Sequence, residues 1–104
     1  MGILTERGAS DWHPAPRQLR EAGKEAAKLC RSRGINLPEV ALRFAFDHNY
    51  VSSTLVGMST QQDVRESLNV LASESDPGIL EEIHELFTSV FNYVWPSGRP
   101  ENHD

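Results

Sequence analysis

The sequence has little of three things: cysteine, long apolar runs and clustered positive charge. Its single cysteine, Cys30, cannot form an internal disulfide, so we expect a reducing, cytoplasmic setting. No apolar run approaches the roughly 20 residues that span a bilayer, and no signal-peptide pattern precedes the first helix, so we expect no membrane partner. Lysine and arginine total 10 against 15 acidic residues and are spread along the chain, which argues against nucleic acid as a partner.

The composition limits the size of any hydrophobic core. The chain has 104 residues, of which 38% are hydrophobic, and its mean hydropathy is -0.46. A compact chain of this length buries roughly two-thirds of the surface that its unfolded form exposes. We therefore expect at most one small domain with a thin core.

Apolar residues recur at helical spacing in four stretches, and cap residues flank them. Gly34 closes the first stretch, Asn36 precedes the second, Ser59 or Thr60 can cap the third, and Asp76 followed by proline opens the fourth. The face of the third helix that we expect to be buried carries Val64, Leu68 and Leu71. The pattern predicts a loop over 1–16, helices over 17–34, 37–48, 60–73 and 77–91, and a tail over 92–104.

One stretch reads as a β-strand. Residues from Tyr50 to Val56 are rich in β-branched side chains and end at Gly57, which predicts a strand over 51–57. The expected fold class is therefore mainly α with one β-strand. A single strand cannot satisfy its own backbone hydrogen bonds, so it needs partner strands from another chain, a missing segment or a rearranged fold.

The junction between this strand and the next helix is the best candidate for a site. A strand that ends in glycine and turns directly into a capped helix places backbone N–H groups and the hydroxyls of Ser59 and Thr60 at a helix N-terminus. Such an arrangement favours binding of a phosphate oxygen. The alternative is that Gly57 is simply a turn residue and that Ser59 or Thr60 only caps the helix.

Several pieces of sequence, spread over nearly the whole chain, resemble one family of oxidoreductases. They are Gly2-Ile3-Leu4-Thr5-Glu6-Arg7-Gly8, Asp11-Trp12-His13-Pro14-Ala15, Ala41-Leu42-Arg43-Phe44, Leu55-Val56-Gly57-Met58 and Trp95-Pro96-Ser97-Gly98. Together they are similar to the C-terminal third of the aldo-keto reductases, in particular of the L-galactose dehydrogenase and D-arabinose dehydrogenase-like branch. The resemblance implies a fragment of a (β/α)8 TIM barrel that is not closed in this chain. Enzymes of that branch oxidise aldoses at the anomeric carbon with NAD or NADP.

The resemblance also implies where a dinucleotide would bind. The stretch after the strand corresponds to the family's contact with the adenosine phosphate, the following helix to the adenine end, and the opening segment, including Met1, to the pyrophosphate. The implied cofactor-binding residues are Gly2, Leu4, Gly57, Met58, Ser59, Thr60, Asp63, Glu66 and Ser67. Trp12 would border the mouth of the substrate site.

Two of these positions depart from the family pattern. Asp63 stands where NADPH-preferring members tend to have an arginine that pairs with the 2'-phosphate. A carboxylate repels that phosphate and suits the free ribose hydroxyls of NAD, so the expected cofactor is NAD or NADP, with Asp63 favouring NAD. Ser67 stands where many members have an asparagine that contacts the adenine.

The family's catalytic set is an aspartate, a tyrosine, a lysine and a histidine, all from earlier strands. Neither Tyr50 nor Tyr93 matches those motifs, and none of the histidines does, so we assign no catalytic residue. We also expect no metal site. The histidines have no metal-ligand partner three or four positions further along the chain; they are His13, His48, His84 and His103.

Two hypotheses about function follow. In the first, the chain is the cofactor-binding part of an aldo-keto reductase, with a dinucleotide and an aldose as partners in the full-length family, and it needs the missing barrel portion to turn over. In the second, it is a non-enzymatic helical module that binds another protein through an apolar seam around Phe44, Val56 and Phe87. Residues 57–67 separate the two, because only the first needs them to bind a dinucleotide.

Overall fold

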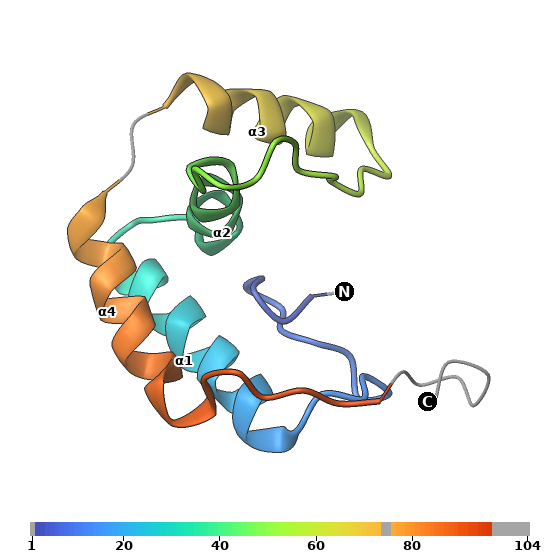
Figure 1. Ribbon diagram of the computed structural model, residues 1–104, viewed down its shortest axis with the longest axis vertical. Helices are drawn as coiled ribbons and strands as arrows, with labels where there is room; N and C mark the ends of the chain where they lie inside the picture. Colours follow the sequence, from blue (N-terminus) through green and yellow to red (C-terminus); the bar gives the residue numbers. More distant parts are fainter. Residues whose placement is uncertain (1, 74–75, 97–104) are drawn as a thin grey trace.

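The computed structural model describes residues 2–73 and 76–96, and this part of the chain folds into four α-helices. They are α1 (Arg17–Ser32), α2 (Leu37–Phe46), α3 (Gln61–Ala72) and α4 (Pro77–Phe87), followed by the short 3-10 helix η1 (Thr88–Val90). Helices α1 and α4 lie side by side, α2 crosses their end, and α3 lies on α2 (Figure 1). Met1 and the Ser97-Gly98 part of the quoted tail motif lie outside the described residues.

Each helix ends earlier than its predicted range. The last turn of the helix predicted over 77–91 is instead η1, because the chain tightens to a 3-10 geometry after Phe87. Among the helices described, none is both long enough and apolar enough to cross a membrane.

Gly34 ends α1 because glycine can adopt left-handed backbone angles. It has a φ of 67°, which places it in the left-handed region that favours glycine. The Ile35 amide donates to the Cys30 carbonyl at 2.8 Å and the Gly34 amide donates to the Arg31 carbonyl at 3.2 Å. These two bonds make a Schellman motif, which satisfies the last carbonyls of α1 and turns the chain toward α2.

The core lies where α1, α2 and α4 meet. Its buried members are Ala26, Ala27, Cys30, Leu37, Ile79 and Ile83. The small side chains of α1 let α4 approach closely, and full burial of a leucine or isoleucine contributes about 1.5–3 kcal/mol. The ion pair between Arg33 and Glu82 joins the same two helices but is half-exposed, so it contributes at most about 1 kcal/mol. Apolar packing therefore holds these helices together.

The opening loop packs on α1. It is folded back on itself, with the Thr5 hydroxyl donating to the Gly2 carbonyl at 2.7 Å and the Gly8 amide donating to the Thr5 carbonyl at 3.1 Å. Ile3 sits directly over Gly23, where a Cβ atom would lie 2.6 Å from the Ile3 carbonyl oxygen. Gly23 is therefore the position at which α1 accepts the backbone of the loop.

A second contact joins the opening loop to the end of the described chain. The His13 ring is buried, with 5% of its surface exposed, and lies between Trp12 and Trp95 at centroid distances of 5.9 and 6.0 Å. The Ala15 amide donates to Nδ1 of His13 at 3.1 Å. The two tryptophans that the sequence placed in separate loops thus share one aromatic cluster.

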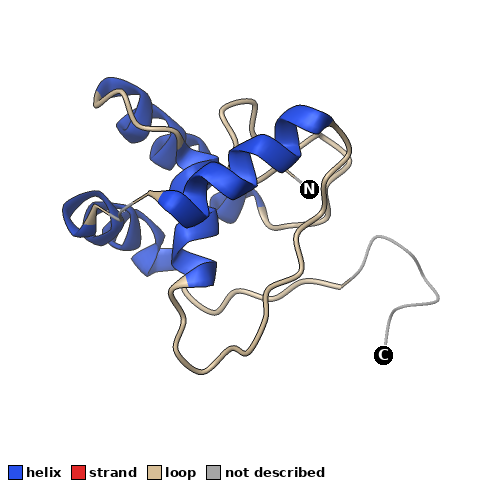
Figure 2. Cartoon of the chain, turned by 90° about the horizontal axis from the view of Figure 1, so that it is seen from above, coloured by secondary structure: helices blue, strands red, loops and turns tan. Residues whose placement is uncertain are grey.

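The predicted strand over 51–57 is wrong for this structure. All regular elements of the described residues are helical, and residues 53–59 run as an irregular segment without a turn (Figure 2). A strand exists only when a neighbouring strand takes up its backbone hydrogen bonds. The part of the chain that the structure describes offers no second strand, so the β-branched residues have an extended preference with nothing to pair with.

The predicted buried face of α3 is also wrong. Val64, Leu68 and Leu71 are exposed, whereas Ser67 and Val70 are buried. Helix α3 packs chiefly against α2, and that contact covers only a narrow stripe of α3. The apolar spacing predicts the helix correctly but cannot tell which of its faces finds a partner.

Replacing Gly23 with alanine tests whether the opening loop packs on α1 at this position. Overpacking costs about 1–3 kcal/mol, whereas alanine in a helix gains about 0.5–1 kcal/mol over glycine, so we expect a net loss of about 1 kcal/mol. Urea unfolding followed by tryptophan fluorescence measures it. Gly57→Ala is the matched control, because nothing lies within 4 Å of its Cβ position. A gain in stability for Gly23→Ala would show that the loop does not rest on α1.

Candidate cofactor-binding site

The start of α3 is built around one carboxylate oxygen. Oδ2 of Asp63 accepts hydrogen bonds from the Ser59 amide at 2.9 Å, from the Ser59 hydroxyl at 3.1 Å and from the Thr60 amide at 3.1 Å. In return, the Asp63 amide donates to the Thr60 hydroxyl at 3.1 Å. The result is a capping box in which the N-cap and the third helical residue satisfy each other's backbone amides.

The local sequence explains this geometry. Thr60 has extended backbone angles, φ -133° and ψ 161°, so its side chain can turn back over the first turn of the helix. Asp63 stands at the third helical position, where a carboxylate reaches the amides that precede the helix. The positive end of the helix dipole favours a negative charge at the same place.

These hydrogen bonds also set the charge of Asp63. The Ser59 amide, and after it the Ser59 hydroxyl, lower the pKa of the Asp63 carboxyl below its ordinary value, and Thr60 acts in the same direction. The bonds stabilise the ionised form, so Asp63 carries a full negative charge at neutral pH. The start of α3 therefore holds an anionic oxygen of its own.

The remaining residues expected on this helix have local partners. The Ser67 side chain is buried, and its hydroxyl donates to the Asp63 carbonyl at 2.9 Å. Glu66 accepts a hydrogen bond from Gln62 at 3.1 Å across one turn of the helix. Gly57 and Met58, just before the cap, are exposed. Residues 57–60 thus form an exposed turn that the half-buried Asp63 caps, and Ser67 is buried one turn further along the helix.

The residues expected beside the pyrophosphate lie elsewhere. Leu4 packs against the helical core, where it lines an apolar pocket of about 170 Å³ together with Phe44 and Phe87. Gly2 stays within the opening loop, and Met1 lies outside the described residues. Trp12 is 69% exposed and stacks on His13. The structure gathers residues 57–67 but does not bring the opening segment into the same site.

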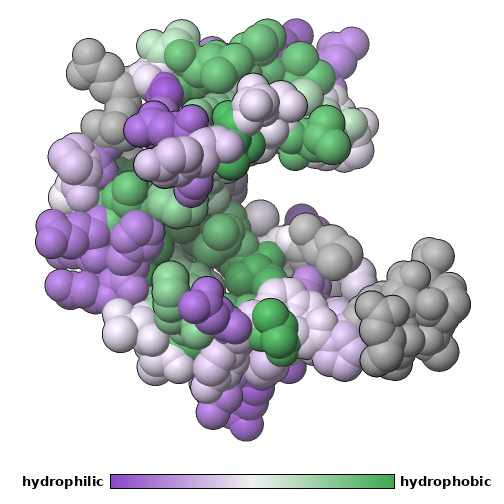
Figure 3. Space-filling view, viewed as in Figure 1, coloured by the Kyte–Doolittle hydropathy of each residue, from purple (hydrophilic) through white to green (hydrophobic). Residues whose placement is uncertain are grey.

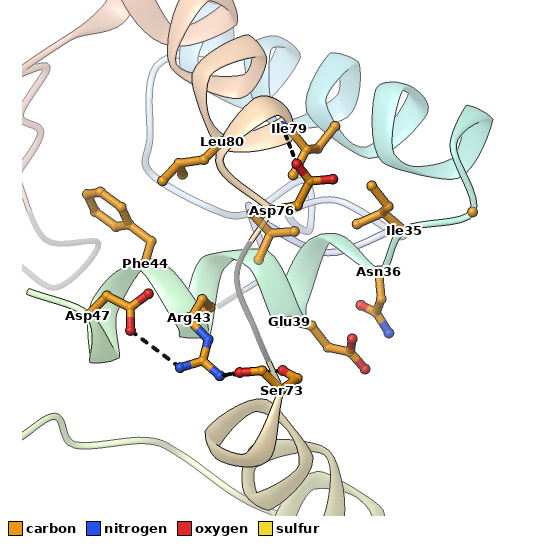
Figure 4. A pocket seen from close by; sticks show the side chains of 12 residues that line it. Ile35, Asn36, Glu39, Arg43, Phe44, Asp47, Ser73, Asp76, Ile79 and Leu80 are labelled. Carbon is orange, nitrogen blue, oxygen red and sulfur yellow. Dashed lines mark hydrogen bonds and ion pairs between the residues drawn. The ribbon is translucent and has the colours of Figure 1, made fainter.

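Arg43 is the residue of this region whose role sequence reasoning missed. Its guanidinium donates to the carbonyls of Val70 and Ser73 at the end of α3, and to Asp47 at 3.3 Å (Figure 4). Its Nε is buried without a hydrogen-bond partner among the described residues. Arg43 belongs to the Ala-Leu-Arg-aromatic stretch, which could have marked it, but nothing in the sequence says that it caps a helix about 30 residues further along.

A pocket of about 710 Å³ lies beside Arg43, between α2 and the start of α4 (Figure 4). Apolar and charged side chains share its wall, among them Ile35, Glu39, Phe44 and Asp76. Asp76 is engaged as the N-cap of α4, with hydrogen bonds from Gly78 at 3.0 Å and Ile79 at 3.3 Å. The residues expected to contact a cofactor do not line this pocket.

The cysteine and the possible metal ligands were the remaining candidates for chemistry. Cys30 is buried in the core, and burial raises the pKa of its thiol, so the neutral form is favoured. Within residues 2–73 and 76–96, no three His, Cys, Asp or Glu side chains come together as a metal site would require.

Comparison with known proteins identifies the family that this chain resembles. The model of the Aldo/keto reductase family matches residues 1–87. The chain is 36% identical over 106 residues to L-galactose dehydrogenase of Arabidopsis thaliana, an alignment that covers 98% of this chain. It is 29% identical over 112 residues to D-arabinose 1-dehydrogenase of Saccharomyces cerevisiae, with 96% of this chain covered. In both cases the chain spans 33% of the length of the relative.

Removing the guanidinium of Arg43 tests its hold on α3. Arg43→Met keeps most of the aliphatic stem but loses the bonds to Val70 and Ser73, so we expect a loss of about 1.5–3 kcal/mol. Urea unfolding followed by circular dichroism measures this. Arg65→Met, at an exposed site of α3, is the matched control and should change stability by less than about 0.5 kcal/mol. Equal effects of the two variants would contradict the role of Arg43.

The pH dependence of stability tests the capping box. Because the pKa of Asp63 is lowered in the folded state, the unfolded chain takes up the proton first as the pH falls. The stabilisation is complete above the ordinary aspartate pKa of about 3.9 and is lost as the pH falls through the folded value. Asp63→Asn should flatten the dependence of the free energy of unfolding on pH in this range, and Glu66→Gln should not. Denaturant unfolding at several pH values measures this dependence. A curve unchanged by Asp63→Asn would contradict the assignment.

Proposed function

The chain belongs to the aldo/keto reductase family, and from that membership we propose that residues 57–67 hold the adenosine-phosphate half of a nicotinamide dinucleotide. The start of α3 would take the phosphate, with Ser59 and Thr60 as donors. Gly57 and Met58 would lie alongside it, and Asp63, Glu66 and Ser67 toward the adenosine.

One observation carries this proposal. Two amides and one hydroxyl converge on a single anionic oxygen, that of Asp63, at 2.9–3.1 Å. The turn is therefore geometrically able to coordinate an oxyanion, which is what a phosphate-binding helix N-terminus requires. These donors are already occupied, so a phosphate oxygen would replace Oδ2, and the Asp63 side chain would turn outward as it enters.

The surroundings of Gly57 support the same reading. Its φ is not positive and nothing lies within 4 Å of its Cβ position, so neither a turn nor close packing requires glycine here. A glycine without an internal reason is expected where a ligand approaches the backbone closely.

Asp63 would also select between the two cofactors. A carboxylate turned out of the cap would stand close to the adenosine ribose, where it can accept hydrogen bonds from free hydroxyls but repels a 2'-phosphate. Its lowered pKa keeps it charged across the neutral range. We therefore propose NAD rather than NADP as the preferred ligand.

The reaction would be that of an oxidoreductase acting on an aldose. The two relatives are dehydrogenases of L-galactose and D-arabinose by name, and a bound nicotinamide dinucleotide supplies hydride transfer. We propose that the groups that move the proton lie outside the residues of this chain. Leu4, Gly2 and Trp12 would join the cofactor and the mouth of the substrate site only when the rest of the fold is present.

A second candidate function has its own observation. Of the apolar seam expected around Phe44, Val56 and Phe87, Phe44 is exposed and the other two are half-buried, while Leu68 and Leu71 of α3 are exposed as well. Large exposed apolar surfaces are typical of protein-binding faces. A helical interaction module would use this surface and would be indifferent to dinucleotides.

Amide chemical shifts during a titration with NAD test the first function. We expect the Ser59 and Thr60 amides to shift saturably at up to millimolar NAD, because they change their acceptor from Asp63 to a phosphate oxygen. NADP should bind more weakly to the wild-type chain.

Two matched variants sharpen the titration. Asp63→Asn removes the charge and should narrow the difference in affinity between NAD and NADP, whereas Glu85→Gln, at an exposed position of α4 outside the proposed site, should preserve it. If neither cofactor shifts the amide signals of residues 57–67 in any of the three proteins, these residues do not bind a dinucleotide. The helical interaction module would then be the better hypothesis.

A further inference from the structure

Half of the positively charged residues of the chain lie on one face of α1. The chain has 10 lysine and arginine residues, and five of them recur in α1 at intervals of three or four positions. At about 100° per residue these positions span an arc of about 80°, so the helix gathers side chains that are separated along the sequence. We call this row the basic stripe; its members are Arg17, Arg20, Lys24, Lys28 and Arg31.

The basic stripe is open to solvent and only partly neutralised. Four of its members are exposed, and Arg20 is half-buried. Arg17 pairs with Glu21 at 2.8 Å, and Lys28 pairs with Glu25 at 3.3 Å. Exposed pairs of this kind contribute little stability, so an incoming anion can replace either glutamate. Within the described residues, the other three members of the stripe form no ion pair.

The stability of α1 does not account for the basic stripe. The amides at a helix N-terminus carry a partial positive charge, which favours acidic residues in the first turn. The first turn of α1 has no acidic residue and carries Arg17 and Arg20, and the N-cap residue Pro16 makes no capping bond. Only Arg31, in the last turn, suits the helix dipole. Residues that break a local rule without strengthening the fold are expected at functional positions.

Charge is distributed unevenly over the molecule. Helix α1 has five cations and two glutamates, a net charge of +3, whereas the whole chain has a net charge of -5. The residues outside α1 therefore carry -8 in sum. The basic stripe is a positively charged surface on an otherwise acidic chain, and such a local potential attracts anionic groups.

The basic stripe differs from the exposed apolar surface of the molecule. Apolar side chains gather over α3 (Figure 3), and further segments of a longer fold can pack against such a surface. Cations are almost never fully buried unless they are paired, because removing a charge from water is costly. The basic stripe is therefore a surface for an anionic partner whether or not further segments surround α1.

The spacing of the basic stripe fits an acidic helix. Its cations recur every three or four residues, a rise of about 4.5–6 Å, and the whole stripe is about 21 Å long. A partner helix with acidic residues at the same intervals presents its carboxylates at the same rise. Arginine forms bidentate hydrogen bonds with a carboxylate, and three members of the stripe are arginines.

A phosphate-bearing surface fits the basic stripe less well. Nucleic acid and anionic bilayers present negative charge over an area much wider than one row of side chains. Glu21 and Glu25 are exposed beside the stripe on the same helix, and the residues outside α1 are acidic in sum. These charges repel a broad polyanion more strongly than they repel a single acidic helix.

We propose that the basic stripe of α1 is a docking surface for an acidic helix of another protein. Carboxylates of the partner replace Glu21 and Glu25 in their ion pairs and also pair with the members of the stripe that have no ion pair in the described structure. The stripe shares no residue with residues 57–67, so this inference does not depend on the proposed function.

Binding of an acidic peptide to the full chain tests the proposal. The probe is a fluorescently labelled, alanine-rich helical peptide with glutamate at every third or fourth position, and the same peptide with glutamine at those positions is the neutral control. At physiological salt, fluorescence anisotropy should show the acidic peptide binding at least about tenfold more tightly than the neutral one, and more weakly as salt is added.

Two variants with the same net charge separate the basic stripe from the overall charge of the chain. Lys24→Gln combined with Arg31→Gln removes two charges from the stripe, and Arg65→Glu, at an exposed site of α3, lowers the net charge by the same amount. We expect the first to weaken binding of the acidic peptide at least about fivefold and the second to weaken it less than about twofold.

Three results would overturn the proposal. In the first, the acidic peptide binds no more tightly than the neutral one. In the second, Arg65→Glu weakens binding as much as the double variant does. Duplex DNA and vesicles of phosphatidylcholine and phosphatidylserine provide the third, because tighter binding of either one through the basic stripe would replace the acidic helix with a phosphate-bearing partner.

Discussion

The packing of α4 against α1 is the contact on which the rest of the structure depends. Ile79 and Ile83 of α4 fit against the small side chains of α1, and Leu37 at the start of α2 closes the same core. Everything else attaches to this base: the opening loop rests on Gly23, and α3 attaches through α2. The radius of gyration is 14.4 Å, slightly above the value of about 13 Å for a compact domain of 100 residues. A thin core with elements attached at its edges explains why so much apolar surface stays exposed.

Under the proposed function, helix stability and ligand binding would compete at the start of α3. The amides that would donate to a phosphate oxygen donate instead to the carboxylate of Asp63, so the proposed site would be preorganised and the chain itself occupies it. An incoming anion therefore exchanges one acceptor for another and gains only the difference between them. Arg43, on α2, donates to carbonyls at the opposite end of α3 and so helps to hold this helix on α2.

Local chemistry made much of the fold predictable from the sequence. Gly34 in the left-handed region, the Thr60 capping box and the Asp76 cap each follow from residues within a few positions of one another. What depends on distant partners was not predictable. The strand over 51–57 needs a neighbouring strand, the buried face of α3 depends on which surface meets α2, and the role of Arg43 joins residues 27 and 30 positions apart. The candidate site divides in the same way, since residues 57–67 are local to one turn, whereas Gly2 and Leu4 could join them only through long-range structure.

The central proposal is that the Ser59 and Thr60 amides at the start of α3 bind a phosphate of a dinucleotide, and that the Asp63 carboxylate accepts their hydrogen bonds when no dinucleotide is bound. A crystal structure of the chain with ADP-ribose tests this claim most directly. The account predicts a phosphate oxygen within hydrogen-bonding distance of the Ser59 and Thr60 amides, with the Asp63 carboxylate turned out of the cap. A ligand bound elsewhere, with the hydrogen bonds from Ser59 and Thr60 to Asp63 intact, would contradict it.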